Sequence, residues 1–335
     1  MKQLALKIIE KSGGFSAFNR FTKNTATIFM LHRFARRPIP GEHWPTTELL
    51  HEFLSYLHSH KYRVMTLREY VKTIISKEDT YKTVVFTVDD GYRDFYLNAF
   101  EVFREFRYPA AIFLTGDFIE NRLFLWWDKI EYAINSTRHD KIDLGFMDQD
   151  VVSISEKAQK DGVILKIISY CKKIDNQKKM QIIDNIIESL EVDVTGQPEG
   201  IYEPLNWDEI EEMSREGIEF FPHTKTHPIL SNISYDEKKV ELAEPKEMIE
   251  KKLNKPADIF CYPNGQPGDF DQETIELLKS LGYIAAVVGY EGFENTRDEI
   301  DLFRIRRFPI PRDVYHFKQY VSGLESFKSR LRGNN

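Results

Sequence analysis

The chain has 335 residues, of which 41% are hydrophobic and 30% are charged, and its formal net charge is −7. This is the composition of a globular protein and excludes a disordered or fibrous chain. The negative balance argues against the basic surface with which a protein follows nucleic-acid phosphates, so we expect no nucleic-acid partner. Two cysteines, Cys171 and Cys261, are too few for a disulfide framework or a cysteine-based zinc site.

The segment 1–25 predicts an N-terminal helix, because its apolar residues recur at helical spacing within 3–11: Leu4, Leu6, Ile8 and Ile9. The simplest interpretation is a helix packed on the surface of the protein. Peripheral membrane contact through this helix is the alternative. No apolar run has the length of a signal peptide or of a membrane span, so we expect a cytoplasmic location.

Short, continuously apolar runs then alternate with helical patterns. Such runs are typical of strands buried on both faces of a parallel sheet, and the alternation favours a barrel or a doubly wound sheet. The predicted strands are 27–32, 63–66, 83–88, 109–115, 218–222, 258–262, 284–288 and 303–310. The predicted helices between them are 47–59, 67–76, 93–106, 207–216, 235–253 and 272–281.

One interval breaks this alternation. Between Thr115 and Ile218 the pattern is helical, at 127–136, 155–174 and 177–190. A βα repeat needs about 30–40 residues, so about 80 residues are surplus. We therefore predict a mostly helical insertion over 121–204, within an α/β body made of 26–120 and 205–325 and followed by a tail, 326–335.

The first chemical signal is a pair of adjacent carboxylates, Asp89 and Asp90, which ends an apolar strand and is followed by Gly91. Chemistry in parallel α/β folds lies at the carboxyl ends of strands. Two like charges side by side are costly unless a cation or a proton stabilises them. The alternative is a simple turn that caps the next helix.

The second signal is a pair of histidines, His223 and His227, in a loop between Pro222 and Pro228. A spacing of four is common among zinc ligands, whereas two unrelated surface histidines are the alternative. This loop also follows a predicted buried strand. Asp90, His223 and His227 would give three protein ligands and one open position, the pattern of a catalytic zinc site.

The third signal is the loop that contains Tyr262 and Asn264, after another apolar strand. Backbone N–H groups in such a loop can form an oxyanion hole. Taken alone, the stretch is typical of an ordinary turn.

Together these segments resemble the polysaccharide deacetylase family, also called carbohydrate esterase family four. The family's Thr-Phe-Asp-Asp-Gly motif is similar to residues 87–91, and its His-Ser/Thr-x-x-His-Pro motif to residues 223–228. The resemblance spans about residues 26–315, with the insertion as a gap. Its flanking matches are Leu31-His32-Arg33-Phe34, Trp207-Asp208-Glu209, Tyr262-Pro263-Asn264-Gly265 and the strand Phe303–Ile310.

The resemblance implies a distorted (β/α) barrel of seven or eight mostly parallel strands. It also implies that Asp90, His223 and His227 hold a divalent metal, usually zinc, and that Asp89 is the general base. Thr224 would support the metal or bind substrate, and Asn264 would line the substrate site. The metal and a backbone N–H, that of Tyr262, would hold the oxyanion while acetate and a free amine are formed.

The sequence departs from the family in two places. The arginine that opens the third motif is absent, since Phe260 and Cys261 stand there, and Arg307 is the candidate to replace it beside Asp89. The alternative is a solvated arginine. The histidine that usually supplies the general acid is also absent from the last strand, so His32 is the substitute candidate, with a hydrogen-bonded rim histidine as its alternative.

A further motif, Leu125-Trp126-Trp127-Asp128, opens the insertion. Trp127 could stack on a sugar or be excluded from water in a core. Asp128 could cap the following helix.

We therefore expect a metal-dependent N-deacetylase that hydrolyses the acetamido group of an N-acetylated amino sugar in a polysaccharide or glycan precursor. A lipid-linked or nucleotide-linked intermediate is the expected substrate. The alternatives are a catalytically inactive glycan-binding barrel and a two-carboxylate glycosidase, which would leave the histidines unexplained.

Overall fold

The computed structural model describes residues 2–11, 13–148, 150–194 and 197–331. Each predicted strand region contains a strand. In chain order these are β1 (Thr27–Leu31), β2 (Arg63–Val64), β3 (Thr83–Val88), β4 (Ala111–Leu114), β7 (Glu219–Pro222), β8 (Ile259–Cys261), β9 (Ala285–Val287) and β10 (Phe308–Pro309).

Helices connect these strands, and apart from the short helix after β4 they lie where the periodicity predicts them. They are α2 (Thr47–Ser59), α3 (Leu67–Ile75), α4 (Asp94–Asn98), α5 (Phe100–Phe106), α6 (Gly116–Ile119), α10 (Trp207–Arg215), α11 (Tyr235–Leu253) and α12 (Gln272–Ser280). The single helix predicted over 93–106 is wrong. The backbone at Ala99 leaves the helical region, with φ −123° and ψ −37°, and divides the segment into α4 and α5.

The strands pair in parallel, in the order β10-β1-β3-β4-β7, and β8 pairs with β9. β1 pairs with β3 along its whole length. On the other side of β3, β2 pairs with its first residues and β4 with its last two. A parallel bridge between Val287 and Ile305 connects β9 to the segment that leads into β10, so this segment closes one side of the structure.

The strands share one inner cluster of apolar side chains. Alternate residues of six strands and of the segment before β10 meet there: Ile28, Val85, Ala111, Phe113, Phe221, Ile259, Cys261, Ala285, Val287 and Ile305. A single cluster that receives side chains from all the surrounding strands is the interior of a barrel. Between β7 and β8 the described residues form no ladder pair. The expected distorted α/β barrel of mostly parallel strands is therefore confirmed.

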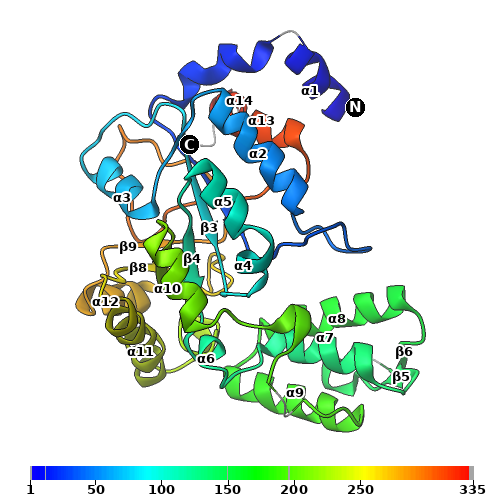
Figure 1. Cartoon of the computed structure of the whole chain (residues 1–335). Coiled ribbons are helices and arrows are strands. Elements are labelled where there is room, and N and C mark those ends of the chain that lie inside the picture. Colours follow the sequence, from blue (N-terminus) through cyan, green and yellow to red (C-terminus); the bar gives the residue numbers. More distant parts are fainter. Residues whose placement is uncertain (1, 12, 149, 195–196, 332–335) are drawn as a thin grey trace.

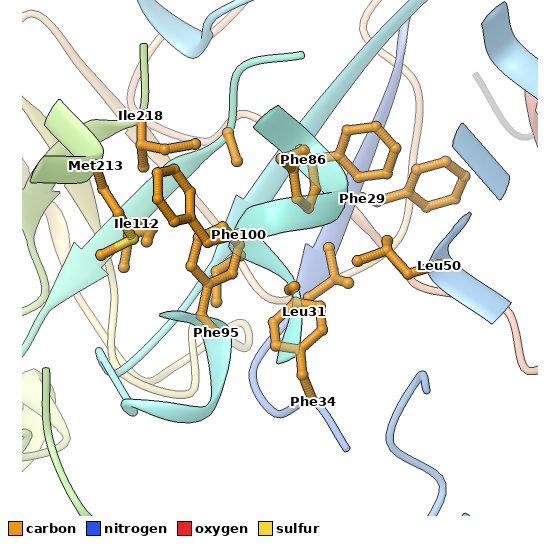
Figure 2. Close-up of a cluster of buried hydrophobic side chains, with 14 of the residues drawn as sticks. Phe29, Leu31, Phe34, Leu50, Phe86, Phe95, Phe100, Ile112, Met213 and Ile218 are labelled. Carbon is orange, nitrogen blue, oxygen red and sulfur yellow. The ribbon is translucent and has the colours of Figure 1, made fainter. Parts of the chain in front are cut away.

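The opposite faces of the same strands pack against helices. Figure 2 shows part of this outer cluster, in which Phe29 and Leu31 of β1 and Phe86 of β3 lie near Leu50 of α2. Phe95 and Phe100, from α4 and α5, cover the sheet beside Ile112, and Met213 and Ile218 continue the cluster. Because both faces are covered, the strands read as continuous apolar runs rather than as alternating ones.

The surplus segment forms a separate group of helices at one end of the molecule (Figure 1). It contains α7 (Trp126–Ser136), α8 (Lys157–Cys171), α9 (Asn176–Ser189) and a short antiparallel pair, β5 (Lys141–Ile142) and β6 (Val152–Ser153). These elements bury their own apolar cluster, which includes Ile130, Ile164, Ile167, Ile183 and Ile186. The predicted helical segments are thus present, and they pack mainly on one another.

Both ends of the described chain lie at the end of the molecule away from the insertion (Figure 1). The first helix, α1 (Lys2–Lys11), packs near α13 (Val314–Val321), with Leu6 buried and Glu10 paired with Lys318. A 3₁₀ helix, η1 (Gly14–Thr22), follows it. The segment predicted as a tail from residue 326 begins inside α14 (Leu324–Leu331), and residues 332–335 lie outside the described residues. Among the described helices, none combines the length and the apolar character that crossing a membrane needs.

Candidate active site

The two motifs meet at the carboxyl end of the barrel. Asp89 and Asp90 follow β3, while His223 and His227 follow β7, and only β4 separates these strands. Asp90 and His227 have φ angles of 75° and 60°. Residues other than glycine rarely adopt these values, and such strained backbone is typical of functional sites whose surroundings hold it in place.

Gly91 makes the turn after the aspartates sterically feasible. Its φ is 94°, and a Cβ atom there would lie 2.9 Å from Ile119 and 3.0 Å from Leu114. Only glycine combines this backbone conformation with this close approach. The residue therefore keeps Asp90 turned toward the histidines.

Three side-chain atoms form a nearly equilateral triangle. Nε2 of His223 and Nε2 of His227 lie 3.2 Å apart, and Oδ1 of Asp90 lies 3.5 and 3.4 Å from them. Tetrahedral zinc ligands at about 2.0–2.1 Å from the metal are about 3.3 Å apart. All three residues are buried. The donor set and its spacing therefore fit a divalent metal such as zinc.

The backbone fixes which nitrogen of His223 faces the centre of the triangle. Its Nδ1 lies 2.8 Å from the carbonyl oxygen of Cys261. Since a carbonyl can only accept, Nδ1–H donates, and in the neutral ring Nε2 keeps its lone pair. Metal-binding histidines commonly have this kind of support at their other nitrogen.

The electrostatics of the triangle also suit a cation. Burial alone would raise the pKa of Asp90, but hydrogen bonds from the two histidines hold it well below its usual value. Burial would lower the pKa of His223, yet Cys261 and Asp90 raise it well above the usual value. Burial, helped by the charge of His223, lowers the pKa of His227 to about 4. One ionised carboxylate and one neutral imidazole are therefore ready to bind a metal, which would displace the proton of His223.

Arg307 contacts Asp89 with both ends of its guanidinium group. Its Nη1 and Nη2 donate to the two carboxylate oxygens at 2.7 and 2.8 Å, and Nη1 also donates to Oγ1 of Thr87. Burial would raise the pKa of Asp89, but the charge of Arg307 lowers it. Arg307 is 1% exposed, so the alternative of a solvated arginine is wrong.

The small side chain of Cys261 allows Arg307, from the segment before β10, to reach Asp89. Its Sγ lies 3.2 Å from Nη2 of Arg307, and the side chain points into the barrel beside Asp89. A small residue on β8 leaves room for the guanidinium group that arrives from the segment before β10. The positive charge beside Asp89 is thus present, although it comes from a different strand than the family pattern implies.

A cavity of about 450 Å³ opens above the two aspartates and the two histidines. His32 lines it, with Nε2 at 3.7 Å from Oδ2 of Asp89 and 45% of the side chain exposed. Trp127, Tyr262 and Asn264 also line it. The structure therefore brings most of the sequence-predicted site residues to one cavity.

Thr224 does not reach this cavity. Its side chain is fully buried, its hydroxyl donates to the carbonyl of His223, and it accepts from the backbone N–H of His227 at 3.0 Å. Since it is absent from the lining, a substrate contact is not supported for Thr224. The residue instead fixes the turn that carries both histidines.

The N–H of Tyr262 is already engaged. It donates to the carbonyl oxygen of Val287 at 3.3 Å, as part of the pairing between β8 and β9. Its use as the oxyanion donor is therefore not supported in this structure. The Tyr262 ring stacks on Phe270.

The insertion contributes a wall of the cavity that the motifs did not reveal. Nε1 of Trp127 donates to the hydroxyl of Tyr92 at 3.0 Å, and that hydroxyl donates to Asp128 at 2.6 Å. Trp127 also lies edge-on to His227, with 4.5 Å between ring centroids. Asp128 is therefore not the cap of α7, whose N-cap is Leu125.

Several lining residues were missed at the sequence level, among them Tyr92 and Lys172. Tyr92 directly follows the Asp-Asp-Gly motif, and this proximity was an available signal. Lys172 lies in the insertion among other lysines and gave none. Its Nζ donates to Oδ1 of Asn264 at 2.7 Å, inside the cavity.

Comparison with known families agrees with this geometry. The sequence profile of the family described as polysaccharide deacetylase matches residues 76–286. The chain therefore belongs to the polysaccharide deacetylase family, whose members are hydrolases acting on carbon–nitrogen bonds other than peptide bonds. A search of curated protein sequences finds no match.

Solved structures share the fold at low sequence identity. The Streptococcus pyogenes deacetylase PplD, solved with acetate, is 17% identical, with a TM-score of 0.59 over 91% of this chain and 98% of its own. IcaB from Ammonifex degensii is 13% identical, with a TM-score of 0.56 over 90% and 97%. BC0361, a polysaccharide deacetylase from Bacillus cereus, is 17% identical, with a TM-score of 0.53 over 91% and 69%.

Proposed function

We propose that this protein is a metal-dependent N-deacetylase that hydrolyses the acetamido group of an N-acetylated amino sugar. The observation that carries the proposal is the triangle of Asp90, His223 and His227, with ligand atoms 3.2–3.5 Å apart, next to the carboxylate of Asp89. These residues would hold a divalent metal, for which zinc fits the nitrogen and oxygen donors best. When bound, the metal supplies Lewis-acid activation of water and of the amide carbonyl.

Asp89 is the proposed general base. It does not belong to the triangle, and Arg307 fixes both of its oxygens. Arg307 opposes the effect of burial on the pKa of Asp89 and so keeps the carboxylate ionised, the form that a general base needs. Arg307 is a positioning residue, since it acts through Asp89.

His32 is the proposed general acid for the leaving amine. It lies on the cavity side of Asp89, at 3.7 Å, and is about half exposed, so a bound sugar can reach it. A His32→Gln enzyme should lose one limb of the pH–rate profile. An unchanged profile would exclude the acid role.

The proposed substrate is a polysaccharide or a glycan precursor that is lipid-linked or nucleotide-linked. The family supports an acetylated glycan, and the cavity of about 450 Å³ is large enough for one or two sugar rings. We also propose that Trp127 offers an apolar face beside His227 to the acetamido methyl group or to the ring.

Acetate release tests the proposal directly. The metal-free protein should release no acetate from N-acetylglucosamine oligomers, and adding one equivalent of zinc should restore activity. The Asp89→Asn variant should retain zinc while its rate falls by about 10²–10⁴-fold. A zinc-loaded protein that binds the oligomers but releases no acetate would instead be a glycan-binding barrel.

A further inference from the structure

The insertion places one lysine in the metal-site cavity. Lys172 is the C-cap residue of α8, and Ile168, one turn earlier, lines the same cavity. The barrel wall beside it carries Asn264 and Gln266. The ammonium group therefore lies where the insertion and the barrel enclose the substrate site together.

The position of this ammonium group is fixed by the barrel. Nδ2 of Asn264 donates to the carboxylate of Asp269, which can only accept, so Oδ1 of Asn264 must face Lys172. The backbone of Lys172 is held as well, because Nδ2 of Asn232 donates to its carbonyl at 3.4 Å and to that of Ile174 at 3.0 Å. The lysine is thus tied to two loops of the barrel.

The charge of Lys172 is not neutralised by a contact. The described ion pairs within 4 Å give it no carboxylate partner, whereas the buried Lys238 has both Asp271 and Glu273. Among the described residues, the ammonium group of Lys172 donates only to the neutral amide of Asn264. An ammonium group has three donors, so two remain for a ligand. Burial also lowers the pKa of Lys172, against the opposing effects of the Asp269 and Asp90 charges.

The rest of the cavity lining carries more negative than positive side chains. Asp89, Asp90, Glu42 and Glu131 line it, whereas its other lysine or arginine, Arg33, is paired with Asp94. A ligand with a negative group would therefore be turned so that this group faces Lys172. A partly buried, unpaired cation is costly, and a bound anion offsets that cost.

We propose that Lys172 determines specificity by binding an anionic group, a phosphate or a carboxylate, that the substrate carries next to its N-acetylated ring. This inference rests on the proposed deacetylase function and adds the substrate class. No motif of the family contains Lys172, since the residue belongs to the insertion. The barrel would supply the reaction, and the insertion would select which acetylated sugar is presented to it.

The experiment compares charged and neutral substrates with matched variants. Zinc-loaded wild type, Lys172→Met, Lys172→Arg and Lys173→Met are assayed for acetate release. Lys173 is the exposed neighbour and serves as the control. The substrates are methyl N-acetylglucosaminide, N-acetylglucosamine 1-phosphate and N-acetylmuramic acid, so that phosphate and carboxylate are distinguished.

We expect Lys172→Met to raise KM for one of the two anionic substrates at least tenfold. Its kcat/KM on the neutral glycoside should stay within about twofold of wild type. Lys172→Arg should retain most of the preference, and Lys173→Met should change nothing. An equal loss of kcat/KM on neutral and anionic substrates would show that Lys172 only stabilises the position of the insertion, and would overturn the inference. A wild-type enzyme with no preference for anionic substrates would overturn it as well.

Failure of the proposed function gives a different result. In that case the zinc-loaded wild type releases no acetate from any substrate. Calorimetric binding of N-acetylglucosamine 1-phosphate to wild type and to Lys172→Met then still decides the inference. Equal affinity would reject it, and at least tenfold weaker binding by the variant would support it.

Discussion

The barrel and the insertion contribute to the same cavity in different ways. The barrel supplies buried, charged groups whose positions follow from parallel strand ends: Asp89 and Asp90 after β3, His223 and His227 after β7. The insertion supplies side chains from α7 and α8, which rest on an apolar cluster of their own. One region thus builds the reaction centre, and the other builds a wall around it.

This difference indicates which of the two regions would tolerate amino-acid substitutions. The proposed metal triangle, with sides of 3.2–3.5 Å, depends on backbone that the whole barrel fixes, so small displacements would destroy it. The insertion is tied to the barrel through polar contacts such as Lys172 with Asn264 and Trp127 with Tyr92. Its residues away from Trp127, which contacts His227, should therefore be able to vary without altering the metal site.

The largest effect is expected from removing a metal ligand of the barrel. His227→Ala should lower deacetylase activity by about 10³-fold or more and abolish stoichiometric zinc binding, because two ligands cannot close the site. Metal analysis and acetate release measure this. His51→Ala, a half-exposed histidine on α2, is the control. Zinc retained at full occupancy would contradict the assigned triangle.

The next effect concerns the group that holds the base. Arg307→Ala leaves the buried carboxylate of Asp89 without its partner, so kcat should fall by about 10²-fold and stability by about 3–5 kcal/mol. Arg307→Lys should recover part of both, since one contact can re-form. Zinc content should not change. Full kcat in Arg307→Ala, measured at saturating substrate, would remove its positioning role.

A matched pair of cavity-forming variants separates the two cores. Ile167→Ala in the insertion should cost about 2–5 kcal/mol, and hydrogen exchange should accelerate in α8 and α9 while zinc affinity stays unchanged. Val85→Ala, inside the barrel under Asp89, should cost less, because it removes fewer carbons, but should weaken zinc binding. If Ile167→Ala weakened zinc binding as much as Val85→Ala, the two regions would not be separable.

The last prediction, which leaves the reaction centre untouched, is a pH dependence of stability. Burial raises the pKa of Asp128 to about 8. The charges of Glu131 and Asp90 also raise this pKa, whereas Tyr92 and Arg33 lower it. Between about pH 4 and pH 8 the folded state binds a proton that the unfolded state lacks, so stability falls as the pH rises through this window.

The Asp128→Asn variant should remove this slope and be more stable than wild type at pH 8, since the amide still accepts from Tyr92. Urea unfolding from pH 5 to pH 8 measures the difference. Asp184→Asn, on the exposed face of α9, should keep the wild-type slope. The same slope in Asp128→Asn would show that another group is responsible.

The sequence by itself determined the strands of the barrel and the sheet edge at which the aspartates and histidines meet. Continuous apolar runs predict strands buried on both faces, and β3 and β7 lie where the pattern places them. Parallel strands share one carboxyl edge, so residues directly after β3 and β7, which only β4 separates, can lie close together. That local rule brings Asp90 to His223 although 133 positions separate them in the numbering.

Only the tertiary structure decided which groups complete the site. Arg307 reaches Asp89 because Cys261 leaves space inside the barrel, and no spacing in the chain encodes that space. The N–H of Tyr262 donates to the carbonyl of Val287, a pairing that the sequence did not predict. Lys172 lies in the cavity, although the sequence of the insertion around it resembles a solvated surface. Local pattern reports burial and strand ends, whereas the partners of a side chain depend on the volumes that distant elements leave beside one another.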